Sequence, residues 1–184
     1  MCSGASDKTT LLQVSFGPVA TEHQQMMRAN ADYAAKRGYK YVVCGDNDDC
    51  RLKLTDLAAM HEAARRMLTK PETTLACLAS DVYRFAAAEL LAPVLYVDRD
   101  CLIHDTYTHG QRLAFAQTGR MIDHFMFYAP DCAAPKHLLR MLPIYWGHRP
   151  GYGATHAAVM AEFMGQCDVI GEQHFTHTWA SGYC

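Results

Sequence analysis

The hydrophobic positions of the first 45 residues switch between the period typical of strands and the period typical of helices. Residues 11–16 form a β-rich apolar run that ends at a Gly-Pro turn, which indicates a strand. From Thr21 onward apolar residues recur at helical spacing, and Thr21 with Gln24 has the form of an N-terminal capping box. Residues 39–44 form a second short apolar run. A strand, a helix and a strand in this order predict a parallel βαβ unit with a right-handed crossover.

The rest of the chain continues to alternate helical and extended patterns. We expect helices over 55–68, from the residues after Pro71 to about 91, over 135–142 and over 155–164, and strands over 94–97, 113–116 and 124–128. The run 94–97 is apolar throughout, which is typical of a strand buried on both faces. No repeat or linker divides the chain, so the sequence predicts one α/β domain over residues 1–184.

Two carboxylates follow this wholly apolar strand. Asp98 and Asp100 stand at i and i+2, where an extended chain turns both side chains to the same side. Open α/β sheets place their ligand crevice at the carboxyl ends of the strands, and a carboxylate pair there can hold a hard divalent cation that takes a diphosphate. The alternative is a structural turn in which Arg99 neutralises its neighbours. The similar acidic stretch 46–49 is expected to be a solvated loop.

A second charged pair precedes the strand. Asp81 and Arg84 lie at i and i+3 of the predicted helix, so they can share one face. The simplest interpretation is a surface ion pair. Their neighbours are apolar, however, which places the pair at the margin of a buried face, where charges without a function would be costly.

These two segments together resemble a known family. Residues 79–84 (Ala-Ser-Asp-Val-Tyr-Arg) and 96–100 (Tyr-Val-Asp-Arg-Asp) resemble the signature of the DXD-containing sugar transferases of glycosyltransferase family thirty-two, which are similar in turn to the catalytic domains of large glucosylating toxins. The family usually has two glycines in the connection, where this chain has Leu-Ala-Pro at 91–93. Residues 31–39 and 122–130 match more loosely, and an asparagine is common where Asp123 stands.

The resemblance implies a GT-A fold, a Rossmann-like mixed sheet flanked by helices, with a nucleoside-diphosphate sugar at the strand ends. It also implies manganese or magnesium as cofactor and retention of the anomeric configuration. By this resemblance Asp81 would hydrogen-bond the donor's ribose or sugar hydroxyls, and Arg84 would contact the sugar or the diphosphate. Asp98 would contact the ribose and a metal-bound water, and Asp100 would bind the metal itself. The end of the first strand would line the nucleoside pocket with Gln13, Val14, Ser15 and Phe16.

Further site residues are expected on the same basis. GT-A enzymes often close the metal site from the C-terminal segment, which makes His177 or His174 the candidate third ligand, although a histidine has many other roles. Trp179 is a candidate cover for the donor, with core packing as the alternative. Asp123 is the candidate catalytic carboxylate near the anomeric carbon or the acceptor hydroxyl, with a turn or packing role as the alternative.

Composition narrows the partners. The chain has 184 residues, 50% of them hydrophobic and 20% charged, with a net charge of -2. It therefore has no general positive field that would attract nucleic acid, so the composition weakly disfavours a nucleic-acid partner. Its longest apolar run is too short to span a bilayer. Its eight cysteines form no C-x-x-C pair; we expect Cys44, Cys77 and Cys101 to be small buried thiols of a cytoplasmic protein.

The leading hypothesis is therefore a metal-dependent glycosyltransferase with Asp98, Asp100, Arg84 and Asp123 at its catalytic centre. A nucleotidyltransferase or phosphohydrolase is a second hypothesis, and it would need further carboxylates from Asp123 or from the 46–49 loop. A catalytically degenerate GT-A-like binding module is a third. The acceptor stays open among glycans, lipid-linked saccharides and other groups, and so does the oligomeric state.

Overall fold

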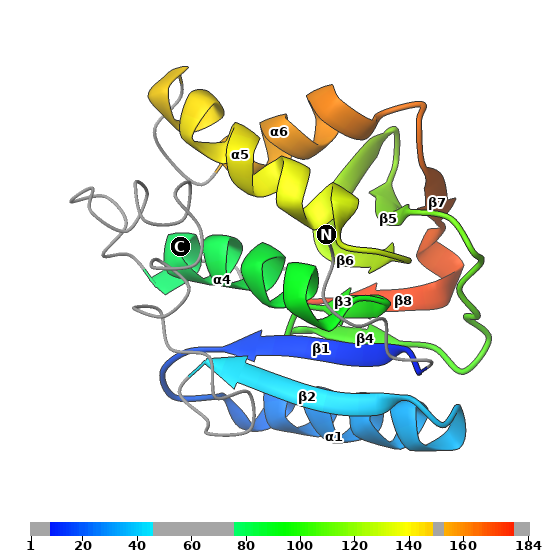
Figure 1. Ribbon diagram of the computed structural model, residues 1–184. Helices are drawn as coiled ribbons and strands as arrows, with labels where there is room; N and C mark the ends of the chain where they lie inside the picture. The colour runs from blue at the N-terminus through cyan, green and yellow to red at the C-terminus, as the bar shows by residue number, and fades with distance from the viewer. Residues whose placement is uncertain (1–7, 46–75, 149–152, 179–184) are drawn as a thin grey trace.

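A six-stranded mixed sheet forms the centre of the computed structural model, which describes residues 8–45, 76–148 and 153–178 (Figure 1). In spatial order its strands are β2 (Lys40–Gly45), β1 (Thr10–Ser15), β3 (Val94–Val97), β6 (Met121–Ala129), β5 (Ala114–Thr118) and β7 (Asp168–Ile170). β1 pairs in parallel with β2 and β3, β6 runs antiparallel to β3 and β5, and β7 is parallel to β5. The expected helix over 55–68 and the acidic loop over 46–49 lie outside the described residues.

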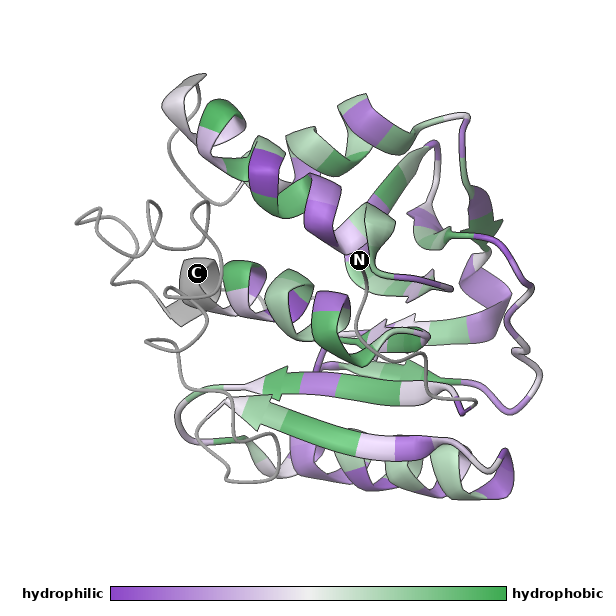
Figure 2. Cartoon of the chain, viewed as in Figure 1, coloured by the Kyte–Doolittle hydropathy of each residue, from purple (hydrophilic) through white to green (hydrophobic). Residues whose placement is uncertain are grey.

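Helices cover both faces of this sheet. One face packs against α4 (Ala76–Leu91), α5 (Ala133–His148) and α6 (Gly153–Phe163). The other face packs against α1 (Thr21–Lys36) and a two-stranded sheet of β4 (Cys101–Ile103) and β8 (Phe175–His177), which follows the short helix η3 (Glu172–His174). In Figure 2 β1 and β2 are mainly hydrophobic, whereas α1 alternates in hydropathy, as expected for a helix with one face in solvent. The predicted α/β class with a helix-flanked mixed sheet is confirmed.

Two local predictions differ from the structure. Thr21 is the first residue of α1 and not its cap: Ala20 occupies the cap position without a side-chain hydrogen bond, and the Gln24 amide donates to the Val19 carbonyl. The helix expected over 135–142 runs through Pro143 to His148. Its last turns bury Trp146 in the core that α4 and α6 also line, and this burial outweighs the hydrogen bond that proline removes.

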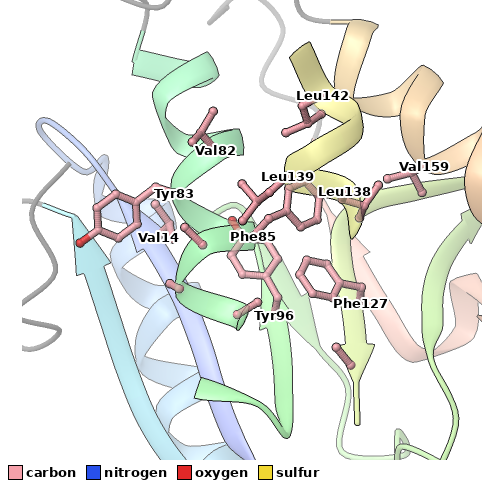
Figure 3. Packing of buried hydrophobic residues seen from close by; sticks show 14 of the residues in the cluster. Val14, Val82, Tyr83, Phe85, Tyr96, Phe127, Leu138, Leu139, Leu142 and Val159 are labelled. Carbon is pink, nitrogen blue, oxygen red and sulfur yellow. The ribbon is translucent and has the colours of Figure 1, made fainter. Parts of the chain in front are cut away.

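The larger of the two cores lies between the sheet and helices α4 to α6. In Figure 3 the ring of Phe85 on α4 sits between the strands and the leucines of α5. It stacks on Phe127 of β6 with 5.5 Å between ring centroids, and Phe127 stacks on Tyr96 of β3 at 5.1 Å. This aromatic column fixes α4 over β3 and β6, the two strands that carry the polar residues described below.

β6 departs from regular pairing where it passes the end of β3. Phe115 of β5 lies opposite Phe127, but the next residue, Ala116, lies opposite Asp123. Residues 124–126 of β6 are thus accommodated in a bulge, and the Asp98 backbone N–H donates to the Phe125 carbonyl at 2.7 Å. Bulges redirect side chains near the ends of strands, and this one turns His124 toward α4.

The cysteines differ from the expectation. Cys44 and Cys132 are each disulfide-bonded, so the prediction of a free buried thiol at Cys44 is wrong. Cys101 is free and buried, as expected, whereas the side chain of Cys77 lies outside the described part. Disulfides persist in oxidising compartments, which counts against the cytoplasmic location. None of the described helices is both long and apolar enough to cross a membrane.

The end of β2 gives a prediction about the fold. Gly45 has a φ of 126°, and a Cβ there would collide with the backbone carbonyl of Ser15 at the end of β1. Gly45→Ala should lower the free energy of unfolding by at least about 2 kcal/mol, measured by urea denaturation, because strain adds to the collision. Gly119→Ala is the control, since Gly119 has a φ of 58° and open space around it. Equal losses in the two variants would show that the close approach of β1 and β2 is unimportant.

Candidate active site

Asp98, Asp100 and His177 meet at the carboxyl end of β3. Each offers one ligand atom, and these atoms all lie within 4.8 Å of one another. The histidine comes from the far end of the chain because β8 pairs with β4, with His177 opposite Cys101. The backbone N–H of Thr178 also donates to the Asp100 carbonyl at 3.0 Å. The tail is therefore fixed directly against the two carboxylates.

Contacts with α1 and with Phe125 of β6 fix the positions of β4 and His177. Asn30 of α1 is fully buried, donates to the Cys101 carbonyl at 2.8 Å and accepts from the Ile103 N–H at 3.0 Å. The His177 ring stacks on Phe125 with 4.3 Å between centroids. Burial raises the pKa of Asp100, but the adjacent imidazole of His177, at 3.5 Å, lowers it more, so the carboxyl stays ionised. These contacts leave a rigid group of two carboxylates and one imidazole.

Behind this group, Arg84 lies buried between two carboxylates. Its guanidinium is 3.0 Å from Asp81 Oδ1 and 3.2 Å from Asp98 Oδ1, and it donates to the His124 carbonyl at 3.2 Å. The exposed fractions of the Arg84 and Asp81 side chains are 6% and 1%, so the alternative of a surface ion pair is wrong. Arg84 also lies over the ring of Tyr96, 4.8 Å from its centroid. The planar, multidentate guanidinium joins α4 to the end of β3.

The two carboxylates beside Arg84 differ in their electrostatics. Burial raises the pKa of Asp98 above its usual value, and Arg84 only partly offsets this. Burial also raises the pKa of Asp81, but Arg84 and His124 together hold it below the usual value. Asp98 is still about one-fifth exposed and accepts a hydrogen bond from the Tyr96 hydroxyl. An ionised Asp98 is therefore costly, and a further cation beside it would stabilise its charge.

A second polar group continues from Asp81 toward α6. His124 Nε2 lies 3.4 Å from Asp81 Oδ1, and its Nδ1 lies 3.0 Å from Asp123 Oδ1. His156 Nδ1 lies 3.3 Å from Asp123 Oδ2, and the Thr155 hydroxyl donates to Asp81 at 2.5 Å. Burial lowers the pKa of His124, but the two carboxylates outweigh it and raise it to about 9. Burial raises the pKa of Asp123, and the two histidines more than reverse that effect.

The sequence singles out Asp123 as a candidate but gives no sign of its neighbours His124 and His156. His124 stands in an expected strand and His156 in an expected helix, with no motif around either. Their meeting depends on the β6 bulge and on α6 starting beside β6, and neither feature has a local sequence signal. Asp123 itself is mostly buried, with both oxygens directed at imidazoles.

The predicted nucleoside-pocket residues fall on β1 and just after it. Gln13 is fully buried and its amide is already used: it donates to the Asp98 carbonyl at 3.1 Å and accepts from the Tyr41 hydroxyl at 2.6 Å. Val14 and Ser15 are also buried in the sheet. Phe16 is half-buried, and its ring meets the edge of Tyr83 at 5.3 Å. Phe16 is thus the member of this set that presents most surface.

The tail residues separate. His177 joins the carboxylates, whereas His174 ends η3 and packs against Tyr107 at 5.5 Å. His174 is therefore not brought to the group of Asp98, Asp100 and His177. Trp179 lies outside the described residues.

The fold has a counterpart among solved structures. A glycosyltransferase involved in the glycosylation of the major capsid of PBCV-1 superposes with a TM-score of 0.52 and 11% identity, over 90% of this chain and 81% of that one. At this identity the likeness concerns the fold, which is that of a glycosyltransferase. No protein-family model matches the chain, and neither does any curated protein sequence.

The buried arginine gives a prediction about stability. Arg84→Met leaves Asp81 and Asp98 without their shared cation and should lower the free energy of unfolding by about 3–5 kcal/mol at pH 7. Arg112→Met is the control, because Arg112 and Asp168 form an exposed ion pair worth less than about 1 kcal/mol. Urea denaturation of both variants makes the comparison. Equal stabilities would show that Arg84 does not hold α4 to β3.

Proposed function

We propose that the protein transfers a sugar from a nucleoside-diphosphate donor with the help of a divalent metal ion. The observation that carries this proposal is the meeting of Asp98, Asp100 and His177 at the carboxyl end of β3, in a fold shared with a glycosyltransferase. A ligand crevice is expected at this edge of an α/β sheet.

The ligand set fits manganese or magnesium. Two carboxylates and one imidazole supply oxygen and nitrogen ligands, which suit Mn²⁺ well and Mg²⁺ through added waters. Asp98, Asp100 and His177 would hold such an ion, and the chemistry it would supply there is neutralisation of the charge on the departing diphosphate. It would also offset the burial that raises the pKa of Asp98. Arg84 holds the Asp98 side chain by its carboxylate, and the Gln13 amide donates to the Asp98 backbone carbonyl.

The remaining side chains fit a donor beside this ion. Ser15 is the last residue of β1 and Phe16 follows it, and β1 lies next to β3 in the sheet. We propose that the nucleoside lies against these two residues. Asp81 and Arg84 lie behind the carboxylates, and we propose them as the residues nearest the donor sugar. We further propose that the reaction retains the anomeric configuration, with Asp123 on the acceptor side. The acceptor class follows from none of these contacts.

The competing enzyme hypotheses need more carboxylates around the metal. In the part of the chain that the structure describes, Asp123 is the other buried acid of this region besides Asp81, and two imidazoles occupy its oxygens. The connection 91–93 has Leu-Ala-Pro in place of the family's two glycines, and β3 after it still pairs with β1, with Val94 opposite Thr10. These two observations support an intact transferase. The 46–49 loop, the other source of carboxylates that a phosphohydrolase would need, lies outside the described residues.

Removing one carboxylate tests the proposal. Asp100→Asn should weaken manganese-dependent binding of a nucleoside diphosphate at least tenfold, because the residue supplies a charged ligand at the edge of the site. Calorimetry with uridine and guanosine diphosphates in Mn²⁺ measures the effect. Asp105→Asn is the control, because Asp105 is exposed and pairs with Lys36 on the surface.

The same preparations test transfer. The wild-type chain with Mn²⁺ should slowly hydrolyse its nucleoside-diphosphate sugar, and nuclear magnetic resonance of the first sugar released should show the anomer of the donor. Binding that is equally tight in Asp100→Asn and the wild type would remove Asp100 from the site, and an inverted first product would contradict retention.

A further inference from the structure

Asp123, His124 and His156 form a compact group that the donor site does not use. Their candidate ligand atoms lie within 4.8 Å of one another, as do those of the first group. We propose that this group is a second metal site, selective for a borderline transition metal such as Zn²⁺. The proposal does not depend on the proposed function, because it concerns residues outside the group of Asp98, Asp100 and His177.

The spacing of the side-chain atoms matches a coordination sphere. The Asp123 carboxylate lies between two ring nitrogens, with Oδ1 3.0 Å from His124 Nδ1 and Oδ2 3.3 Å from His156 Nδ1. Ligands of a tetrahedral zinc stand about 2.0–2.1 Å from the ion, so they are about 3.3 Å from one another. Each nitrogen therefore lies about as far from a carboxylate oxygen as two ligands of one ion do, and one ligand atom of each residue lies within 4.8 Å of the other two.

His124 supplies an independent observation. Its side chain is 95% buried, and its Nδ1 makes no well-aligned hydrogen bond although Asp123 Oδ1 lies 3.0 Å away. A buried polar atom without a hydrogen bond is costly. Nδ1 faces the Asp123 carboxylate at 3.0 Å, and a cation held between Asp123 and His156 would take the place of the ring proton at Nδ1 and satisfy this nitrogen.

The other ring nitrogen of His124 has the surroundings of a metal-bound histidine. Nε2 lies 3.4 Å from Asp81 Oδ1, and histidine ligands commonly direct their second nitrogen at a carboxylate that fixes the tautomer. Asp81 is fixed in turn by the Thr155 hydroxyl and by Arg84. The ligands thus have supporting contacts of the kind that is common around metal-bound histidines.

The two groups differ in the metal they favour. Two imidazoles and one carboxylate suit zinc and its neighbours, whereas the first group has two carboxylates and suits harder ions. Arg84 lies between the groups and binds Asp98 on one side and Asp81 on the other, so the two sites share no ligand. His156 and Asp123 keep 28% and 13% of their side chains exposed, which leaves a path for the ion and a fourth position for water or another oxygen ligand.

Metal stoichiometry tests the second site. The metal-stripped full chain is titrated with Zn²⁺ by calorimetry, and bound zinc is counted by mass spectrometry after gel filtration. His156→Gln should lose one equivalent of zinc relative to the wild type and keep manganese-dependent binding of nucleoside diphosphate. Asp100→Asn should keep that equivalent. His137→Gln, which removes an exposed histidine paired with Glu162, is the matched control and should bind as the wild type does.

Cobalt gives a readout of the ligands themselves. Co²⁺ at this site should show the visible absorption of a four-coordinate ion, and His156→Gln should lose it. Asp123→Asn is the second variant, and circular dichroism confirms that both variants fold. Unchanged zinc stoichiometry in folded His156→Gln and Asp123→Asn would overturn the second site. Loss of all bound zinc in Asp100→Asn would also overturn it, because that variant leaves Asp123, His124 and His156 intact. The first-site proposal is tested separately by diphosphate binding, so the two can fail independently.

Discussion

The burial of Arg84 between Asp81 and Asp98 is the constraint on which the site depends. Three charges leave water together, and this is tolerable only because the guanidinium reaches both carboxylates and the His124 carbonyl at hydrogen-bonding distance. Their placement requires α4 to lie over the ends of β3 and β6, which the stack of Phe85, Phe127 and Tyr96 secures. Packing and charge thus fix the same geometry.

This constraint leaves an excess of negative charge at the surface of the site. Arg84 is shared by two carboxylates, and Asp100 adds a third beside His177. Burial makes ionised Asp98 costly, so the arrangement is completed most favourably by a cation from solution. On the proposed function, the near-neutral chain needs no basic surface to bind an anionic donor, because one bound ion would supply the positive charge locally.

Features with a local sequence signal were predictable. The βαβ start, the apolar strand at 94–97 and the pairing of Asp81 with Arg84 follow from periodicity and spacing, and the structure has all three. The partners of Asp123 were not predictable, because His124 is turned by a bulge in β6 and His156 is delivered by α6. The hydrogen bond that the Gln13 side chain accepts comes from Tyr41 on the neighbouring strand β2, and no local pattern indicated this pairing. The disulfides at Cys44 and Cys132 also lacked any recognisable spacing.

We propose that Asp98, Asp100 and His177 hold a divalent ion that binds a nucleoside diphosphate. The most direct test of this proposal is calorimetric titration of His177→Ala and the wild type with nucleoside diphosphate, in Mn²⁺ and in EDTA. We predict wild-type binding that requires Mn²⁺ and an at least tenfold weaker affinity in the variant, since the variant loses one of the three proposed ligands. Wild-type binding of equal strength in EDTA would contradict it.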